Sequence, residues 1–269
     1  MPRSLAHCFI SFTMLVLLSA GCKKNDAPAG PLGNMPDHFV QRVMIEELTA
    51  EWCPTCPHGD STLDTIRQRY GDTVVIVSIH WQDAFDKALT YEPVIDSFGQ
   101  TNGYFPSAAI NRIQDLNSTD FWYGTQDWLA AVSTQVSADN KTGIALVSTV
   151  IGDSATIEVH IGFHATNAYD MRLNVFLVEN NVPQQNQDGG YPGYIHQDVL
   201  RAIVTPVLGA PFSMNTMTEV VKKYRVSIAG YNASNLVFAT SVSKWGTAPT
   251  DRHVFNARKV AVGQTAKWQ

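Results

Sequence analysis

The sequence predicts an α/β domain followed by an all-β sandwich domain. Between residues 38 and 140, strand-like runs alternate with helix-like runs, which is the pattern of an α/β domain with a parallel core. From residue 141 onward helical periodicity disappears, and apolar and polar residues alternate as they do in half-buried antiparallel strands. A chain of 269 residues has room for both domains.

The first domain is expected to alternate strands with helices. We predict strands over residues 43–48, 73–80 and 107–112, and helices over residues 54–70, 93–99 and 120–136. The run 73–80 is rich in β-branched residues, which is typical of a parallel strand that is buried on both faces.

The second domain, residues 141–269, is expected to contain strands only. We predict them over residues 144–151, 156–163, 171–178, 220–228, 236–244 and 253–262. Strands of this number and length favour a sandwich of immunoglobulin-like architecture. Residues 180–217 form a long excursion rich in Gln, Asn, Gly and Pro, which either carries a function or packs against the first domain.

The N-terminal residues predict export and a lipid anchor. The apolar run 8–18 is too short to span a membrane and suits a signal peptide over residues 1–21. Small residues just before Cys22 resemble a bacterial lipobox, in which this cysteine is acylated; an ordinary signal peptide with a bystander cysteine is the alternative. Lys23 favours the outer membrane, by resemblance to Gram-negative sorting rules. Residues 22–37 would then be a flexible tether, and the protein would face the periplasm or the cell surface.

Charge divides along the same boundary as the predicted domains. Residues 38–140 carry fourteen acidic and five basic side chains, whereas residues 141–269 carry eight acidic and eleven basic ones. An acidic first domain argues against nucleic acid as a partner, because binding to nucleic acid needs a basic surface.

Two cysteines carry the chemistry that the sequence suggests. Once the signal peptide is removed and Cys22 is acylated, Cys53 and Cys56 are the only free thiols. They lie where a strand is followed by a helix, and Pro54 suits the first helical position. A helix N-terminus stabilises a thiolate, and the second thiol is close enough to attack a mixed disulfide formed by the first. A disulfide closing so small a loop constrains the unfolded chain little, so a purely structural role is poorly motivated.

Two motifs carry a resemblance to a known superfamily. The segment Glu47–Cys56 resembles the active-site strand and turn of the thioredoxin superfamily, with an acid six residues before the first cysteine, a tryptophan just before it, and C-x-x-C opening a helix. Gly103–Ser107, just before a predicted strand, resembles the cis-proline loop of that superfamily. The resemblance covers residues 40–140 and implies a thioredoxin-like α/β domain. Pro57 departs from the pattern, which has a basic residue there, and this leaves the reduction potential open.

The resemblance also implies a role for each residue of the motifs. Cys53 would be the exposed nucleophile and Cys56 the shielded resolving thiol. Glu47 would point beneath the cysteines, where burial would raise its pKa and let it exchange a proton with Cys56. Glu46 faces the other way, so only one of the two glutamates is expected to point inward. Pro106 cannot donate a hydrogen bond and would leave neighbouring backbone free to pair with an extended substrate.

Aromatic and histidine side chains are expected to bind the substrate. His80 and Trp81 end the second predicted strand, and ligands of open α/β sheets gather at the carboxyl ends of the strands. Trp52 and Phe105 flank the two motifs. We therefore expect these four side chains to line the substrate site.

The same edge of the predicted sheet carries candidate metal ligands. Cys53 and Cys56, with His80 or His58, could hold copper(I) or zinc, but the sequence offers no evident fourth ligand for zinc. Such histidines more often line a pocket, so we expect no metal and no cofactor.

A narrower resemblance spans most of the chain. The lipobox, Ile45–Thr49, Phe105–Pro106 with Ile110–Arg112, and His196–Arg201 together resemble the twenty-eight-kilodalton outer-membrane lipoprotein family of Gram-negative bacteria. This resemblance implies a location and a domain layout more than a chemistry.

Three functions remain open from the sequence. The leading one is thiol–disulfide exchange on protein or peptide thiols, with an unknown electron donor, which would make the protein an oxidoreductase. The second is a non-enzymatic outer-membrane adhesin or assembly lipoprotein that uses the first domain as a scaffold. The third is a copper(I) chaperone.

Overall fold

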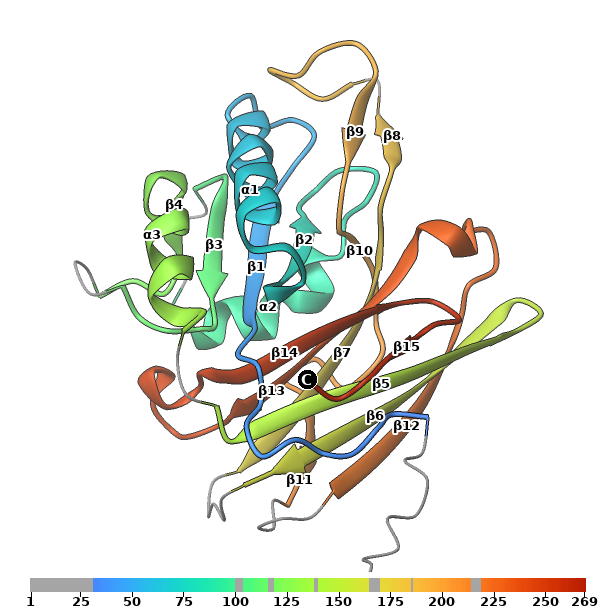
Figure 1. Ribbon diagram of the computed structural model, residues 1–269. Helices are drawn as coiled ribbons and strands as arrows, with labels where there is room; N and C mark the ends of the chain where they lie inside the picture. Colours follow the sequence, from blue (N-terminus) through green and yellow to red (C-terminus); the bar gives the residue numbers. More distant parts are fainter. Residues whose placement is uncertain are drawn as a thin grey trace, which may run out of the picture.

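The computed structural model describes residues 31–99, 104–115, 119–137, 140–164, 170–184, 186–213 and 219–269. The predicted signal peptide, Cys22 and most of the predicted tether lie outside these ranges. Figure 1 shows helices gathered on one part of the molecule and a larger region of strands. The N-terminal elements are β1 (Val43–Thr49), α1 (Cys56–Tyr70), β2 (Val74–His80), α2 (Ala88–Ser97), β3 (Ser107–Ile110), β4 (Tyr123–Gly124) and α3 (Thr125–Gln135).

The remaining elements that the structure describes are strands and short 3-10 turns. The strands are β5 (Thr142–Ile151), β6 (Ser154–Phe163), β7 (Met171–Glu179), β8 (Val182–Gln184), β9 (Tyr194–His196), β10 (Val199–Ile203), β11 (Ala210–Phe212), β12 (Glu219–Ser227), β13 (Leu236–Lys244), β14 (Val254–Ala261) and β15 (Thr265–Ala266). The long predicted strands lie within one or two residues of these bounds. Strands β8 to β11 lie in the excursion 180–217, where the sequence suggested none.

The predicted fold class is wrong, because the N-terminal strands do not form a sheet of their own. One nine-stranded mixed sheet runs in the order β14-β13-β7-β10-β2-β1-β3-β4, with β11 added beside β7. The link is β10, which pairs parallel to β2 through Val199 and Ser78, and antiparallel to β7. The chain is therefore mostly β, and an α/β domain with a separate sandwich behind it does not describe it.

The second large sheet packs on the C-terminal part of the first. Its order is β12-β6-β5-β15, and a core of buried side chains from β5 and β6 meets side chains of β7 and β13. This part of the molecule has the two layers expected of a β-sandwich, although one of its sheets extends into the region of the helices.

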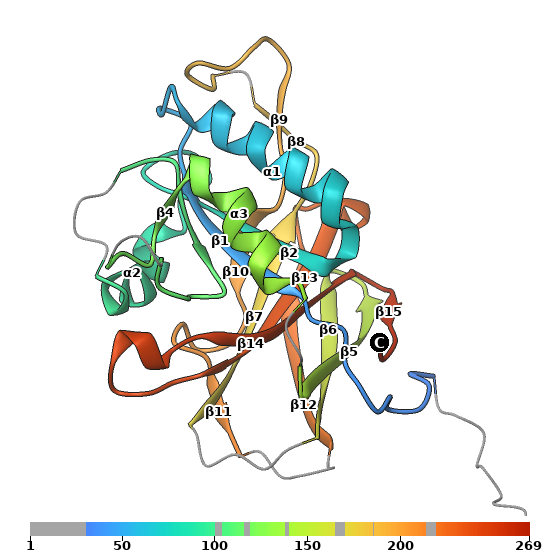
Figure 2. The same cartoon turned by 60° about the vertical axis from the view of Figure 1, so that its left-hand side comes forward.

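The helices cover both faces of β1, β2 and β3. Leu63 and Ile66 of α1 and Trp128 of α3 pack on Val43 and Ile45 of β1. Helix α2 lies on the opposite face, against the core that contains Met44 and Leu48 of β1. Figure 2 shows α1 and α3 side by side in front of the sheet. Alternate residues of β1 therefore face α1 or α2.

Two local predictions need correction. Helix α1 begins at Cys56 with Thr55 as its N-cap, so Pro57, and not Pro54, occupies its first turn. The end of the predicted tether is not free: Leu32 is buried, and the carbonyl of Pro36 accepts a hydrogen bond from the ring of His164 at 2.6 Å. Within the described ranges, no helix combines the length and the apolar character needed to cross a membrane.

Candidate redox site

Cys53 and Cys56 form a disulfide at the start of α1. Their Cα atoms are 5.4 Å apart, and the backbone N–H of Cys56 donates to the carbonyl of Cys53 at 3.2 Å. Cys56 is fully buried, as the resemblance implied. Cys53 is only 2% exposed, so the expectation of an exposed nucleophile is wrong for the disulfide form.

The loop before β3 forms one side of the site. The Phe105–Pro106 peptide bond is cis, in agreement with the resemblance, and the carbonyl of Phe105 accepts a hydrogen bond from the Thr55 hydroxyl at 3.2 Å. Gly59 of α1 lies against Pro106: a Cβ atom at Gly59 would be 2.9 Å from the proline ring. A glycine here lets the first turns of α1 approach the cis-proline loop.

An aromatic wall adjoins the disulfide. Phe105 contacts Trp52 and Trp81 edge-on, with ring centroids 5.4 and 6.1 Å away, and the indole N–H of Trp52 donates to the carbonyl of Trp81 at 2.9 Å. Trp52 is 44% exposed. The structure thus brings together three of the four side chains expected to bind substrate.

His80, the fourth, does not reach this wall. Its side chain is buried, and its Nδ1 lies 2.7 Å from the carboxylate of Asp83. It packs edge-on against His196 of β9, with ring centroids 4.9 Å apart.

A second segment covers the disulfide from the other side. The side-chain amide of Gln187 donates to the carbonyls of Ala50 and Cys53, at 3.3 and 3.1 Å. The N–H of Asp188 donates to the carbonyl of Glu51 at 2.8 Å. Gly189 has a φ of +70°, and a Cβ atom there would lie 2.1 Å from a backbone oxygen of the C-x-x-C loop. We call residues 186–190 the covering segment.

Glu47 is buried, as the resemblance implied, and lies against Gly59 of α1. Its side chain is fully buried, and one carboxylate oxygen accepts a hydrogen bond from Ser78 at 2.6 Å. Burial, together with the negative charge of Asp60, raises the pKa of Glu47 to about 8. The other oxygen, Oε1, is buried without a hydrogen-bond partner and faces Gly59. A buried carboxyl of this kind can give or accept a proton near neutral pH.

Glu46 is also buried, on the opposite face of β1, which corrects the expectation that only one of the two glutamates points inward. Arg112 donates to both of its oxygens, at 2.8 and 2.6 Å, and the Tyr91 hydroxyl donates to it as well. A bidentate ion pair can satisfy a buried carboxylate that the sequence pattern would leave at the surface.

The C-terminal half supplies polar side chains that sequence reasoning missed. Tyr194 of β9 donates a hydrogen bond to Asp60 of α1, and His196 lies 4.0 Å from the same carboxylate. Burial raises the pKa of Asp60 and lowers the pKa of His196 to about 4. One signal was present in the sequence, since Asp60 follows Cys56 by a single helical turn and so shares its face of the helix.

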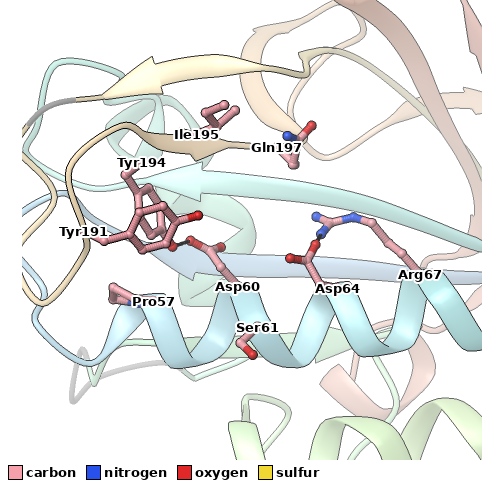
Figure 3. A pocket seen from close by; sticks show the side chains of 9 residues that line it. All are labelled: Pro57, Asp60, Ser61, Asp64, Arg67, Tyr191, Tyr194, Ile195 and Gln197. Carbon is pink, nitrogen blue, oxygen red and sulfur yellow. Dashed lines mark hydrogen bonds and ion pairs between the residues drawn. The ribbon is translucent and has the colours of Figure 1, made fainter.

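A groove runs beside these residues, between α1 and β9. It has a volume of about 380 Å³ and is bounded by α1 on one side and by the turn before β9 on the other (Figure 3). Its lining residues are Pro57, Asp60, Ser61, Asp64, Arg67, Tyr191, Tyr194, Ile195 and Gln197. In Figure 3 the Tyr194 hydroxyl points at Asp60, whereas Asp64 pairs with Arg67.

Two of the candidate metal ligands, Cys53 and Cys56, are joined to each other, whereas His58 is exposed on α1 and the ring of His80 lies against Asp83. Among the residues that the structure describes, no group of three or more His, Cys, Asp or Glu side chains is arranged to hold an ion.

Fold and site together define a mostly β-sheet protein with a C-x-x-C disulfide at the start of a helix. The model of the outer membrane protein Omp28 family matches residues 92–266, which is more than half of the chain. The chain belongs to this family, and its location is the outer membrane of the cell envelope. The matched residues include Pro106, Tyr194 and His196 but not the cysteines.

Solved structures show the same fold at low sequence identity. HBP35 of Porphyromonas gingivalis is 19% identical, with a TM-score of 0.71 over 85% of this chain and 77% of that one. A crystal structure of a protein from Agrobacterium tumefaciens is 15% identical, with a TM-score of 0.53 over 84% of this chain and 96% of that one. No curated protein matches the chain.

Proposed function

We propose that this protein is an outer-membrane lipoprotein that exchanges its Cys53–Cys56 disulfide with protein or peptide thiols. The observation that carries the proposal is a C-x-x-C disulfide at the start of α1 with the buried carboxyl of Glu47 against the same helix, where burial raises the pKa of that carboxyl to about 8. A purely structural disulfide has no need of an acid that titrates near neutral pH. The two motifs that resemble the thioredoxin superfamily support the proposal. The fold of the whole chain does not support it, because the chain is mostly β-sheet.

The exchange would proceed in two steps. In the first, a client thiolate attacks the Cys53 sulfur to form a mixed disulfide, and Cys56 leaves as a thiolate that takes the proton of Glu47. In the second, another client thiolate attacks the client sulfur of the mixed disulfide, so that the client disulfide forms and Cys53 leaves as a thiolate. When the first step runs backwards, Glu47 accepts the Cys56 proton, and the Cys56 thiolate displaces the client thiolate from Cys53. The aromatic wall of Trp52, Trp81 and Phe105 would contact the client beside its sulfur. Acylation of Cys22 would hold the protein at the membrane, and its electron donor is open.

A second candidate function has an observation in its favour. Cys53 is buried between the aromatic wall and the covering segment, as a disulfide without exchange function would be. A non-enzymatic adhesin or assembly lipoprotein would use the site as a scaffold only. Copper(I) delivery has no comparable observation behind it.

The reduction potential of the cysteine pair separates the two candidates. The full chain would be equilibrated across a glutathione series, and its free thiols would be trapped, with Cys53→Ser as the control for specific labelling. A reversible transition between about −120 and −270 mV, the range of known exchange proteins, would support thiol–disulfide exchange. A disulfide that resists reduction below about −300 mV would refute exchange and favour the scaffold.

A further inference from the structure

Asp60 lies between the buried acid of the site and the open groove. It is on α1, one helical turn after Cys56, and it lines the groove with a side chain that is 24% exposed. The cysteine side of the site offers no such opening, because the aromatic wall and the covering segment leave Cys53 only 2% exposed. Asp60 therefore reaches solvent through the groove, whereas the cysteine side of the site is closed.

The turn of α1 that carries Asp60 faces Glu47. Ser78 holds one carboxylate oxygen of Glu47, and the unpartnered Oε1 points toward the turn of α1 that carries Asp60. A Cβ atom at Gly59, the residue before Asp60, would lie 3.1 Å from that Oε1. Among the charges around Glu47, the carboxylate of Asp60 has the largest effect on its pKa.

The outer side of Asp60 is fixed by β9. The Tyr194 hydroxyl donates a hydrogen bond to the Asp60 carboxylate, as Figure 3 shows. Other charged or titratable groups face the two acids from several elements: Asp64 and Arg67 from α1, His80 from β2, and His196 and Asp198 from the β9–β10 segment. Arg67 is itself paired with Asp64 and Asp198, at 2.5 and 2.8 Å.

We propose that Asp60 is a positioning residue that sets the protonation of Glu47 from the groove, and that Tyr194 holds its carboxyl in place. A negative Asp60 keeps the proton on Glu47, because two neighbouring carboxylates repel each other. The proton is then available to the Cys56 thiolate at the moment when the disulfide opens. It follows that a ligand or substitution in the groove that changes the charge of Asp60 changes how readily the disulfide is reduced, without contacting the cysteines.

The inference rests on the proposed function, but Glu47 can be titrated without any redox step. The carboxyl carbon of Glu47 would be followed by NMR from pH 5 to 10 in the oxidised full chain, in Asp60→Asn, Tyr194→Phe and Asp64→Asn. Asp64 is the matched control, because it lies one turn further on the same helix and lines the same groove. Asp60→Glu tests whether a carboxylate at this position restores the effect.

We expect Asp60→Asn to weaken proton binding by Glu47 about tenfold, a size typical of removing one neighbouring like charge. Tyr194→Phe should give a smaller change in the same direction, because the hydrogen bond from Tyr194 favours the ionised form of Asp60 against the effect of burial. Asp64→Asn should stay within about twofold of the parent, since the Asp64 side chain is 60% exposed, is screened by solvent and pairs with Arg67. Asp60→Glu should restore the parent midpoint.

The same variants would be followed in the reduction of the disulfide by dithiothreitol, with rates divided by the thiolate concentration. The corrected reduction rate should fall with rising pH as Glu47 loses its proton. The midpoint pH of this fall should be lower in Asp60→Asn than in the parent. In Glu47→Gln the fall should be absent. Equal Glu47 midpoints in the parent and Asp60→Asn would overturn the inference and leave the proposed exchange intact. A displaced NMR midpoint with a rate independent of Glu47 would instead overturn the link to the disulfide, and with it the proposed role of Glu47.

Discussion

Replacing Glu47 by glutamine should remove a large part of the pH dependence of folding stability. In the unfolded chain the carboxyl ionises near 4.5, whereas in the folded protein burial and the charge of Asp60 raise its pKa to about 8. Between these values the folded protein keeps a proton that the unfolded chain has lost. Raising the pH therefore favours the unfolded chain, and this contribution to stability falls from pH 4.5 to pH 8.

The size of the effect follows from the two pKa values. Each pH unit of difference corresponds to about 1.4 kcal/mol, so the interval from 4.5 to about 8 corresponds to about 5 kcal/mol. Glutamine keeps an acceptor for the Ser78 hydroxyl and cannot ionise. As the pH rises from 4.5 to 8, the free energy of unfolding of Glu47→Gln should increase relative to that of the parent by up to this amount.

Urea unfolding of the oxidised full chain, measured at several pH values, gives the free energies of unfolding to be compared. Glu92→Gln, which removes an exposed carboxylate from α2, is the control and should run parallel to the parent. Parallel curves for the parent and Glu47→Gln from pH 5 to 9 would refute the reasoning, because Glu47 would then be ionised in the fold.

Three further substitutions test other parts of the structure. Arg112→Met leaves the carboxylate of Glu46 buried without its ion pair and should cost about 3–5 kcal/mol of unfolding free energy, measured in urea; a loss below about 1 kcal/mol would contradict the buried pair. Gly59→Ala places a Cβ atom 2.9 Å from the cis-proline ring and should cost about 1–3 kcal/mol, read from the same transition. Gly189→Ala cannot keep its present contact with the C-x-x-C loop and should displace the covering segment, so that dithiothreitol reduces the disulfide faster. Gly193→Ala is its control, with a similar φ but open space around it, and equal rates for the two variants would argue against a covering role.

Local features of this structure could be predicted from the sequence, because they depend on residues close together in the chain. The alternation in β6 and the β-branched run of β2 gave strand bounds within two residues. The resemblance of Glu47–Cys56 to the thioredoxin motif implied a buried acid at Glu47, and the structure buries this side chain against α1.

Features that depend on distant residues could not be predicted. The five-residue strand β10 lies in a polar excursion, and nothing local shows that it pairs with β2 and joins the two halves into one sheet. Glu46 looked exposed because its partner Arg112 comes from beyond β3. Cys53 looked accessible because the covering segment is more than a hundred residues away in the chain.

The shared sheet limits how the candidate site around Cys53 and Cys56 could be transferred to another protein. A domain that can be transferred between proteins normally contains its complete sheet and all the residues that surround its site. A fragment of residues 38–140 would have an unpaired edge at β2, because the N–H of Ser78 would lose the carbonyl of Asp198, to which it donates at 2.9 Å. The fragment would also lack Gln187, Tyr194 and His196. Grafting the C-x-x-C segment onto another carrier therefore requires the β8–β10 segment as well, because a chain that ends near residue 140 lacks Gln187, Tyr194 and His196.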